Sequence, residues 1–139
     1  MNREIKFRGK DLIHNKWIYG GLAEDRHDNA VILPKNNWQK GGCVDKYTIG
    51  QFTGLRDING REIYEGDIVN FDDSLYSVYA HSYTGKVVFY KGQFCVEHHE
   101  DCFTTTFYTP LFKDDFADKK TTVLGNIYDN PELLKGESK

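Results

Sequence analysis

The stretch QFTGLRDINGREIYEGDIV, from Gln51 to Val69, contains two turn signals in close succession. The first is Asn59-Gly60. Both central residues of a type I′ turn need a positive φ, which Asn and Gly adopt at least cost, so this pair predicts a tight β-hairpin. The second is Glu65-Gly66-Asp67, which separates two apolar pairs. It predicts a strand that ends and begins again, with the Asp67 carboxylate accepting backbone N–H groups of the turn.

The chain as a whole has the composition of a β protein. Its 139 residues include 9 Phe, 9 Tyr and 2 Trp but a single Met. Aromatic and β-branched side chains favour pleated, half-buried surfaces, and a chain of this length can bury its core as one domain. We therefore expect a single mostly-β domain over residues 1–139. Its centre is predicted to be a small, partly open β-barrel on residues 51–96, SH3-like by analogy with the Gly-Asp turn, with flanking hairpins and a short C-terminal helical turn.

The N-terminus is predicted to form a hairpin with a basic face. Residues 5–10 alternate apolar or small with basic side chains, and residues 16–19 form the return strand, which is expected to end at Gly20-Gly21. Basic side chains beside aromatic planes are typical of surfaces that bind single-stranded nucleic acid. The alternative is that Phe7 and Trp17 belong to the core and that the basic face is solvated or paired with the acidic remainder. The candidate nucleic-acid surface consists of Arg3, Lys6, Arg8, Lys10, Trp17 and Tyr19.

Residues 24–46 are polar and irregular apart from a possible short strand at residues 30–33, and their role is open. Trp38 lies inside this segment. A Trp in a polar loop commonly folds back as a lid on the core; the alternative is that it marks a contact surface.

The C-terminal region carries the signals of a short helix. Asn130 suits the N-cap, Pro131 the first helical position, and Glu132 the first turn, and two leucines follow. Six residues are therefore expected to have structural roles in turns and caps: Asn59, Gly60, Gly66, Asp67, Asn130 and Pro131.

The segment CVEHHEDC has the residue types of a metal site. Cys95 and His98 stand at a C-x2-H spacing, and His99 and Cys102 at an H-x2-C spacing; thiolate with imidazole suits zinc. Four ligands in one short segment would require a single tight loop to wrap the ion, whereas structural zinc sites usually take two pairs from separate segments. The alternative is a strand that leads into a polar loop. We adopt it and predict no metal site.

Motifs for catalysis and cofactor binding are missing from the sequence. No G-x-S-x-G, H-E-x-x-H, P-loop or G-x-G-x-x-G spacing occurs, so we expect no catalytic residues, no cofactor and no enzymatic activity. The N-terminus has charges where a signal peptide needs an apolar stretch, and no window reaches transmembrane length. The three cysteines are an odd number, which fits free thiols in a reducing compartment. These features predict a cytoplasmic protein without a membrane partner.

The chain carries a series of motifs in a fixed order: IKFRGKD, KWIYG, TGLRDINGREIYEGDIV, VVFYKGQF and VLGNIYDNPELL. This series resembles the YopX family of phage and prophage proteins, from about Arg3 to Leu134. The resemblance implies a small β-rich fold and an uncharacterised biochemical activity, with no established catalytic residues to transfer. It supplies no pattern for residues 24–46.

Two classes of function follow from these observations. A β protein must protect its strand edges, which pairing with a partner protein or another copy achieves, and many tyrosines suit an interface. We therefore expect a non-enzymatic phage or prophage accessory protein that acts as a protein-binding or self-assembling β module. The alternative is nucleic-acid binding through the basic and aromatic N-terminal hairpin. The net charge of −3 gives the whole chain no general affinity for nucleic acid.

Overall fold

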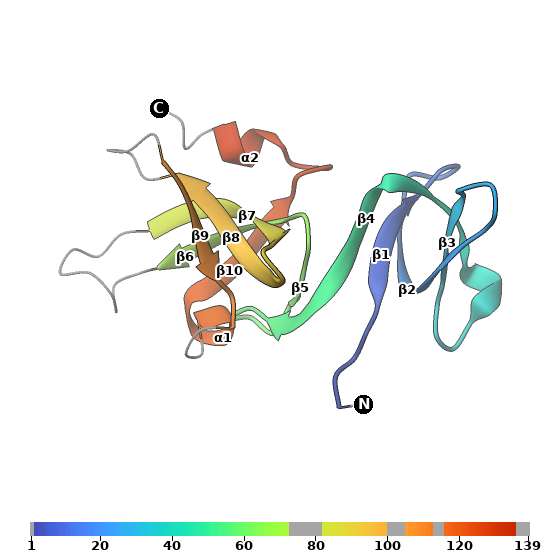
Figure 1. Ribbon diagram of the computed structural model, residues 1–139, viewed down its shortest axis with the longest axis horizontal. Helices are drawn as coiled ribbons and strands as arrows, with labels where there is room; N and C mark the ends of the chain where they lie inside the picture. Colours follow the sequence, from blue (N-terminus) through green and yellow to red (C-terminus); the bar gives the residue numbers. More distant parts are fainter. Residues whose placement is uncertain (1, 73–81, 100–104, 113–115, 136–139) are drawn as a thin grey trace. The chain divides into compact units, whose positions relative to one another are not determined.

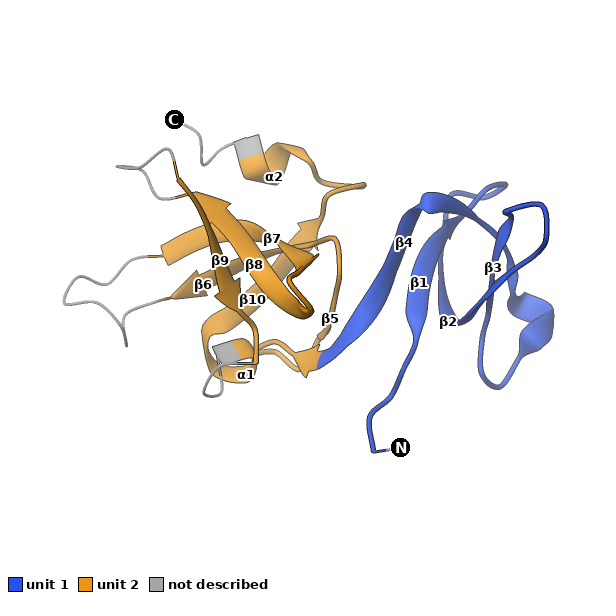
Figure 2. Ribbon diagram, in the orientation of Figure 1, with its two compact units in different colours: residues 1–54 blue, residues 55–139 orange. Residues whose placement is uncertain are grey.

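The computed structural model describes residues 2–72, 82–99, 105–112 and 116–135 (Figure 1). The chain forms two compact units, residues Met1–Gly54 (unit 1) and Leu55–Lys139 (unit 2), which are described separately here (Figure 2). Both units consist mainly of antiparallel strands with a few short helices. The prediction of a mostly-β chain is confirmed.

Unit 1 is a sheet whose hydrogen bonding closes partly on itself. Its strands pair in chain order, and β4 returns to pair with β1. A 3-10 helix, η1, connects β3 to β4. The ring-like part of the fold is therefore the N-terminal sheet rather than residues 51–96, on which we expected the barrel. The elements are β1 (Phe7–Asp11), β2 (Trp17–Glu24), β3 (Ala30–Leu33), η1 (Trp38–Lys40) and β4 (Gly42–Arg56).

A small apolar cluster holds unit 1 together. Ala30, Ile32 and Val44 are buried at its centre, and four partly buried side chains pack against them. In β2 and β3 the members share one face by alternation, whereas Val44 and Ile49 of β4 lie on either side of an irregularity in its pairing with β1. The partly buried members are Phe7, Ile18, Leu22 and Ile49.

Strand β2 continues past Gly20-Gly21, where the sequence predicted its end. Gly20 is the last residue of β2 that pairs with β1, opposite Phe7, and Gly21 is the first that pairs with β3, opposite Leu33. A Cβ on Gly20 would collide with the backbone carbonyl of Leu33. The glycine thus allows close approach of two backbones where β2 changes partner, and does not stop the strand.

Unit 2 is an open sheet in the order β10-β6-β7-β8-β9. Its apolar core includes Ile63, Val69, Phe71, Val87 and Val96, all 2% exposed or less. β9 is an edge strand that ends at Pro110, as expected for a residue that cannot donate to a ladder. The elements are β5 (Glu62–Tyr64), which neighbours the end of β4, β6 (Asp67–Asp72), β7 (Ser82–Tyr90), β8 (Gln93–His99), β9 (Thr106–Pro110), α1 (Phe116–Lys120), β10 (Thr121–Asn126) and α2 (Glu132–Lys135).

Candidate binding groove

Strands β1 and β2 bring the basic and aromatic residues of the N-terminal hairpin together. Opposite residues of an antiparallel pair lie on the same face, and the register pairs Arg8 with Tyr19 and Lys10 with Trp17. Phe7 lies on the other face of β1 and packs against the core of unit 1. The sequence therefore grouped these four side chains correctly, whereas the alternative that Trp17 shares the core with Phe7 is wrong.

Most of the cations in this group are engaged within the protein. The Arg8 side chain is 5% exposed, with its guanidinium 4.6 Å from the centre of the Trp17 ring, and the Lys10 ammonium is 5.5 Å from the same ring. Lys6 forms an ion pair with Glu4 at 3.2 Å. Cation–π contacts and ion pairs occupy the charges that phosphate groups would need. Arg3 is exposed and has no hydrogen bond or ion pair with the described residues.

A groove of about 840 Å³ lies in unit 1, within the size range of ligand sites. It is lined by the N-terminal segment Arg3–Lys6, by residues 19–23 of β2, and by residues between Leu33 and Trp38. Gly21 and Ala23 share a face of β2 by alternation and contribute little or no side chain. A Cβ on Gly21 would meet only the Leu33 carbonyl oxygen, at 3.9 Å, so the space over Gly21 is open.

Two large aromatic side chains are exposed at this groove. Trp38 is 73% exposed and Tyr19 is 45% exposed. The interpretation of Trp38 as a lid on the core is therefore wrong, since a lid would be mostly buried. An exposed Trp beside an open groove supplies a large flat surface against which a ligand can pack.

The groove also runs beside an unpaired strand edge. β1 pairs with β2 only from Trp17 to Gly20, whereas β2 continues to Glu24 and there pairs with β3 along its other edge. Among the described residues, no strand pairs with the first edge over Gly21–Glu24. Such an edge presents backbone N–H and C=O groups that can pair with another extended chain.

The charged side chains at the groove are mostly basic. Arg3, Lys6 and Lys35 line it together with Glu4. The Glu4 carboxylate forms an ion pair with Lys6 and so neutralises its charge. Arg3 and Lys35 are exposed, and neither forms an ion pair with a described residue. The groove therefore favours a ligand that carries negative charge.

The sequence predicted some residues of this groove but not that they lie together. Arg3, Lys6 and Tyr19 were named as candidates, and Trp38 was considered as a contact residue. Gly21 and Lys35 were missed, because the first was interpreted as a strand end and the second lay in an irregular segment. A pair of glycines inside a strand is a signal of close backbone approach, which could have indicated the open space.

Comparison with protein-family models gives a match to the YopX family, described as YopX protein, over residues 6–135. The chain belongs to the YopX family. The match covers parts of both units, but Arg3, Glu4 and Ile5 of the groove lie outside it. A comparison with curated proteins found no match. The crystal structure of protein EF1440 from Enterococcus faecalis is similar, with 23% sequence identity, a TM-score of 0.49, and coverage of 96% of this chain and 99% of that chain.

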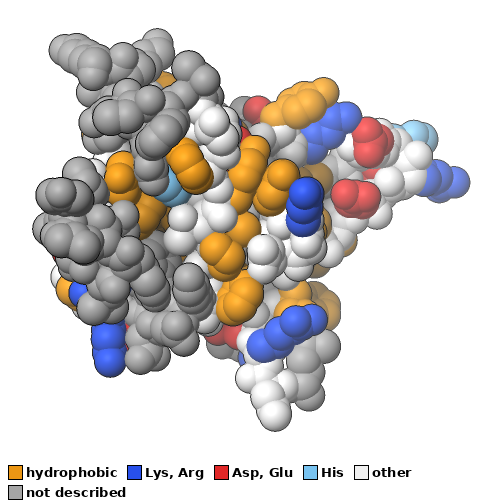
Figure 3. Space-filling view, turned by 60° about the vertical axis from the view of Figure 1, so that its left-hand side comes forward, with side chains coloured by type: hydrophobic (Ala, Val, Ile, Leu, Met, Phe, Trp, Pro, Cys, Tyr) orange, Lys and Arg blue, Asp and Glu red, His pale blue; other side chains and the backbone are white. Residues whose placement is uncertain are grey.

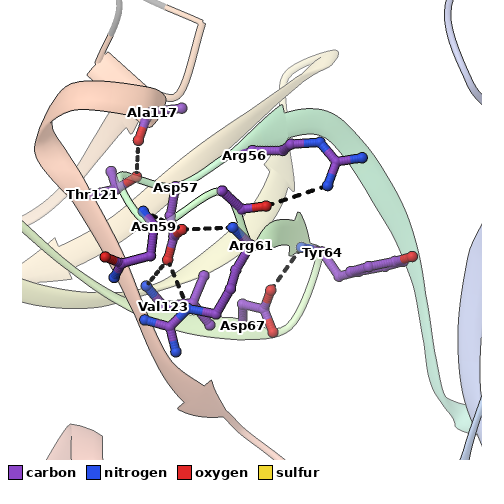
Figure 4. A network of polar contacts seen from close by, with 10 residues as sticks. Arg56, Asp57, Asn59, Arg61, Tyr64, Asp67, Ala117, Thr121 and Val123 are labelled. Atoms are coloured by element: carbon purple, nitrogen blue, oxygen red, sulfur yellow. Dashed lines mark hydrogen bonds and ion pairs between the residues drawn. The ribbon is translucent and has the colours of Figure 1, made fainter.

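In this YopX chain, the turn at residues 57–61 is held by Asp57 (Figure 4). One carboxylate oxygen accepts the backbone N–H groups of Asn59 and Arg61, each at 2.9 Å, and the other accepts the N–H of Val123 at 2.9 Å. The Arg61 guanidinium adds an ion pair at 3.2 Å. Burial by itself raises the pKa of Asp57, but the hydrogen bonds from Val123, Arg61 and Asn59 and the Arg61 charge together lower it below its ordinary value of 3.8.

The type I′ turn predicted at Asn59-Gly60 is wrong. Gly60 has a φ of +78°, but Asn59 has no positive φ, and the Gly60 N–H bonds to the Asp57 carbonyl. This pattern is a turn followed by a left-handed glycine, with the side chain of Asp57 fixing the conformation. Two successive positive φ angles occur instead at Lys91-Gly92, between the paired residues Tyr90 and Gln93.

The predictions for the Gly66-Asp67 turn and for the C-terminal helical turn are confirmed, except for the role of the Asn130 side chain. Asp67 accepts the Tyr64 N–H at 2.7 Å, and Gly66 has a φ of +93°, so both predicted roles are confirmed. The helical turn after Pro131 is confirmed as α2. The Asn130 side chain, however, accepts the N–H of Asn126 at 3.3 Å, and its backbone carbonyl, not its side chain, bonds to the start of the helix.

The residues considered for a metal site do not converge where they are described. Cys95 and His98 are both in β8 and are an odd number of residues apart, so their side chains point to opposite faces. His98 Nε2 is 3.0 Å from the Thr109 hydroxyl, and His99 Nδ1 is 3.3 Å from the Thr106 hydroxyl. Cys102 lies outside the described residues. The described residues contain no group of three His, Cys, Asp or Glu side chains placed to hold a metal ion.

Other exposed apolar side chains are spread over both units. Phe89, Phe112 and Leu124 of unit 2 are 46–65% exposed. Figure 3 shows hydrophobic side chains distributed among polar groups on the face that it turns forward. Phe89, Phe112 and Leu124 do not line the groove of unit 1, whereas the exposed Ile5 does. Within the described part of the chain, no helix is both long and apolar enough to span a membrane.

Proposed function

We propose that this YopX protein is a non-enzymatic binding module that captures a segment of another protein in the groove of unit 1. The proposal includes a role as a phage accessory protein in the host cytoplasm, which rests on the sequence alone. Its main support is the combination of Gly21, Tyr19 and Trp38: open space over a glycine is flanked by two exposed aromatic side chains. Aromatic anchors beside a cavity are the common energetic centre of protein interfaces.

A protein ligand is favoured over nucleic acid because most basic side chains of the N-terminal hairpin already make contacts within the protein. Binding of single-stranded nucleic acid uses several basic side chains along the backbone, together with stacked bases. Arg8 and Lys10 lie over Trp17, and Lys6 is paired with Glu4. The remaining charge can orient an acidic peptide but provides few phosphate contacts.

Selection of ligands from a library of random peptides displayed on phage tests the proposal. The full chain would be immobilised through its C-terminus, because Arg3–Lys6 form part of the groove. We expect enriched peptides that bind the protein in solution, measured by fluorescence anisotropy. Oligothymidylate, titrated under the same conditions at low salt, is expected to bind far more weakly.

Two variants separate groove binding from other contacts. Gly21→Val fills the open space with a side chain that suits a strand, and Trp38→Ala removes an exposed ring; each is expected to weaken the peptide at least about tenfold while leaving the fold intact. Phe112→Ala, which removes an exposed ring outside the groove, is the matched control and should not change affinity. Tight oligothymidylate binding that Trp38→Ala abolishes would establish the nucleic-acid alternative instead. A concentration-dependent dimer by light scattering that Gly21→Val abolishes would identify a second copy as the occupant.

A further inference from the structure

We infer that the occupant of the groove is an extended, acidic peptide that binds as an added strand along the free edge of β2. This inference rests on the proposed function and specifies both the conformation and the charge of the ligand. The edge is that of Gly21–Glu24, where β2 continues beyond its pairing with β1.

The path of the N-terminal segment creates the space for such a strand. If β1 continued its ladder backward from Phe7, residues 3–6 would cover the β2 edge, but the ladder ends at the Phe7–Gly20 pair. The segment Arg3–Lys6 instead lines the groove together with residues 19–23 of β2. The Lys6 carbonyl accepts the N–H of Phe52 at 2.9 Å, which directs this end of the segment toward β4. A ligand strand can therefore take the place beside β2 that β1 leaves.

The length of the edge sets the length of the ligand core. Four residues from Gly21 to Glu24 span about 13 Å at about 3.3 Å per residue. A ligand strand of about four extended residues would cover this distance. In a strand, alternate backbone N–H groups point toward the same neighbour, so only every second ligand N–H would bond to β2.

The side chains around the groove specify the chemistry of the ligand. Arg3 and Lys35 offer positive charges that no described residue neutralises. Tyr19 and Trp38 offer exposed aromatic surface. Apolar side chains of the ligand can pack against the rings, and its acidic side chains can pair with the cations. We therefore expect both apolar and acidic residues in the ligand.

The other exposed features of the molecule support a strand partner less well. β9 is also an edge strand, but it ends at Pro110 and does not border the groove. β7 also continues to Tyr90 beyond its pairing with β6, which ends at Lys86, but neither Phe89 nor Phe94 lines the groove. At β2 a free edge, open space and unneutralised cations occur together.

An N-methyl scan of a peptide selected from the display library tests the strand geometry. Each backbone N–H of the peptide is methylated in turn, and affinity for the full chain is measured by fluorescence anisotropy. We expect methylation to weaken binding at least about tenfold at every second position and to have little effect between these positions. Methylated peptides keep their side chains, so the pattern reports backbone pairing.

Charge is tested separately with Lys35→Glu and Lys40→Glu. Lys35 lines the groove and Lys40 does not, so only Lys35→Glu is expected to weaken the selected acidic peptide, by about tenfold at low salt. A peptide that requires Gly21 and Trp38 but shows no period-two N-methyl pattern would overturn the added strand while leaving the proposed function standing. Failure of Gly21→Val and Trp38→Ala to affect any selected peptide would overturn the proposed function itself. A consensus without acidic residues, insensitive to Lys35→Glu, would overturn the ligand chemistry.

Discussion

A strand edge is covered in unit 2, whereas a strand edge is open in unit 1. In unit 2 the outer edge of β10 is covered by the turn at residues 57–61: the Ile58 N–H bonds to the Thr121 carbonyl at 3.0 Å, and the Asp57 carboxylate accepts the Val123 N–H. In unit 1 the edge of β2 over Gly21–Glu24 has no strand partner among the described residues and borders an open groove. Covered edges prevent unwanted pairing, whereas an open edge beside aromatic side chains is suited to recognition.

Residues 51–69 and the residues of the groove therefore have different roles. The motif with the strongest turn signals, residues 51–69, closes an edge and forms part of the core of unit 2. The groove combines residues of two N-terminal motifs, such as Lys6 and Tyr19, with residues outside any motif, such as Gly21 and Trp38.

Asp57→Ala should cause the largest loss of stability, about 4 kcal/mol. It removes the acceptor of three backbone N–H groups and an ion pair, and it leaves partly buried donors without this acceptor. Chemical denaturation followed by circular dichroism measures the change. Asp118→Ala removes an exposed acid of the same unit and should cost less than about 1 kcal/mol. Equal effects of the two substitutions would show that Asp57 does not close the edge.

The pH dependence of stability should identify the same carboxylate. Its pKa is lower in the folded protein than in the unfolded chain, so its contribution is present above pH 3.8 and is lost as pH falls through the folded-state pKa. In Asp57→Asn, we expect the free energy of unfolding to fall less steeply as the pH is lowered, because the amide does not titrate. Urea denaturation at a series of pH values compares the two proteins, and identical slopes would contradict this role.

Gly20→Ala should destabilise unit 1 by about 3 kcal/mol, since the new Cβ collides with the backbone carbonyl of Leu33. The neighbouring Gly21→Ala is the matched control and should cost less than about 1 kcal/mol, because its Cβ has 3.9 Å of space. Both tryptophans of the chain, Trp17 and Trp38, belong to unit 1, so Trp fluorescence reports its unfolding. If Gly20→Ala does not lower stability, the backbones of Gly20 and Leu33 do not approach closely where β2 changes its pairing from β1 to β3.

The corner formed by Gly125 and Asn130 should show coupling of about 1–2 kcal/mol in a double-mutant cycle. A Cβ on Gly125 would collide with the Asn130 side-chain oxygen. Gly125→Ala alone should therefore cost about 2 kcal/mol, and less when Asn130 is also Ala. Additive effects, measured by thermal or chemical unfolding, would show that the two residues act independently.

The smallest effect is a difference in thiol reactivity with no change in stability. Cys43 of unit 1 is exposed, whereas Cys95 of unit 2 is buried, and burial raises the pKa of its thiol. In a Cys102→Ser background, a thiol reagent should modify Cys43 rapidly and Cys95 only on unfolding. Mass spectrometry of the modified peptides measures both rates. Rapid modification of Cys95 in the native protein would contradict the closed packing of unit 2.

Local signals in the sequence predicted the strands and turns better than the pairing between them. Asp67 and Gly66 were assigned correctly because their roles depend on neighbouring residues. Asp57 was missed because its third hydrogen bond is to Val123, which is distant in the sequence. The ring in unit 1 was missed for the same reason, since the β1–β4 pairing has no local signal.

The candidate site was predicted only in part, for a similar physical reason. The register of β1 and β2 follows from alternation, so the grouping of Arg8 with Tyr19 was correct. Whether a cation is accessible depends on its contacts, and Arg8 proved to be buried over Trp17. The open edge of β2 depends on where the pairing with β1 ends, which alternation does not determine.

Amide hydrogen exchange of the full chain, with and without a selected peptide, tests the contrast between the two edges most directly. We expect the peptide to slow exchange in residues 19–24 and 33–38 of unit 1. The Val123 amide, already held by Asp57, should exchange slowly in both states. Protection confined to β9 or β10 of unit 2, with residues 19–24 unchanged, would contradict binding at the open edge of β2.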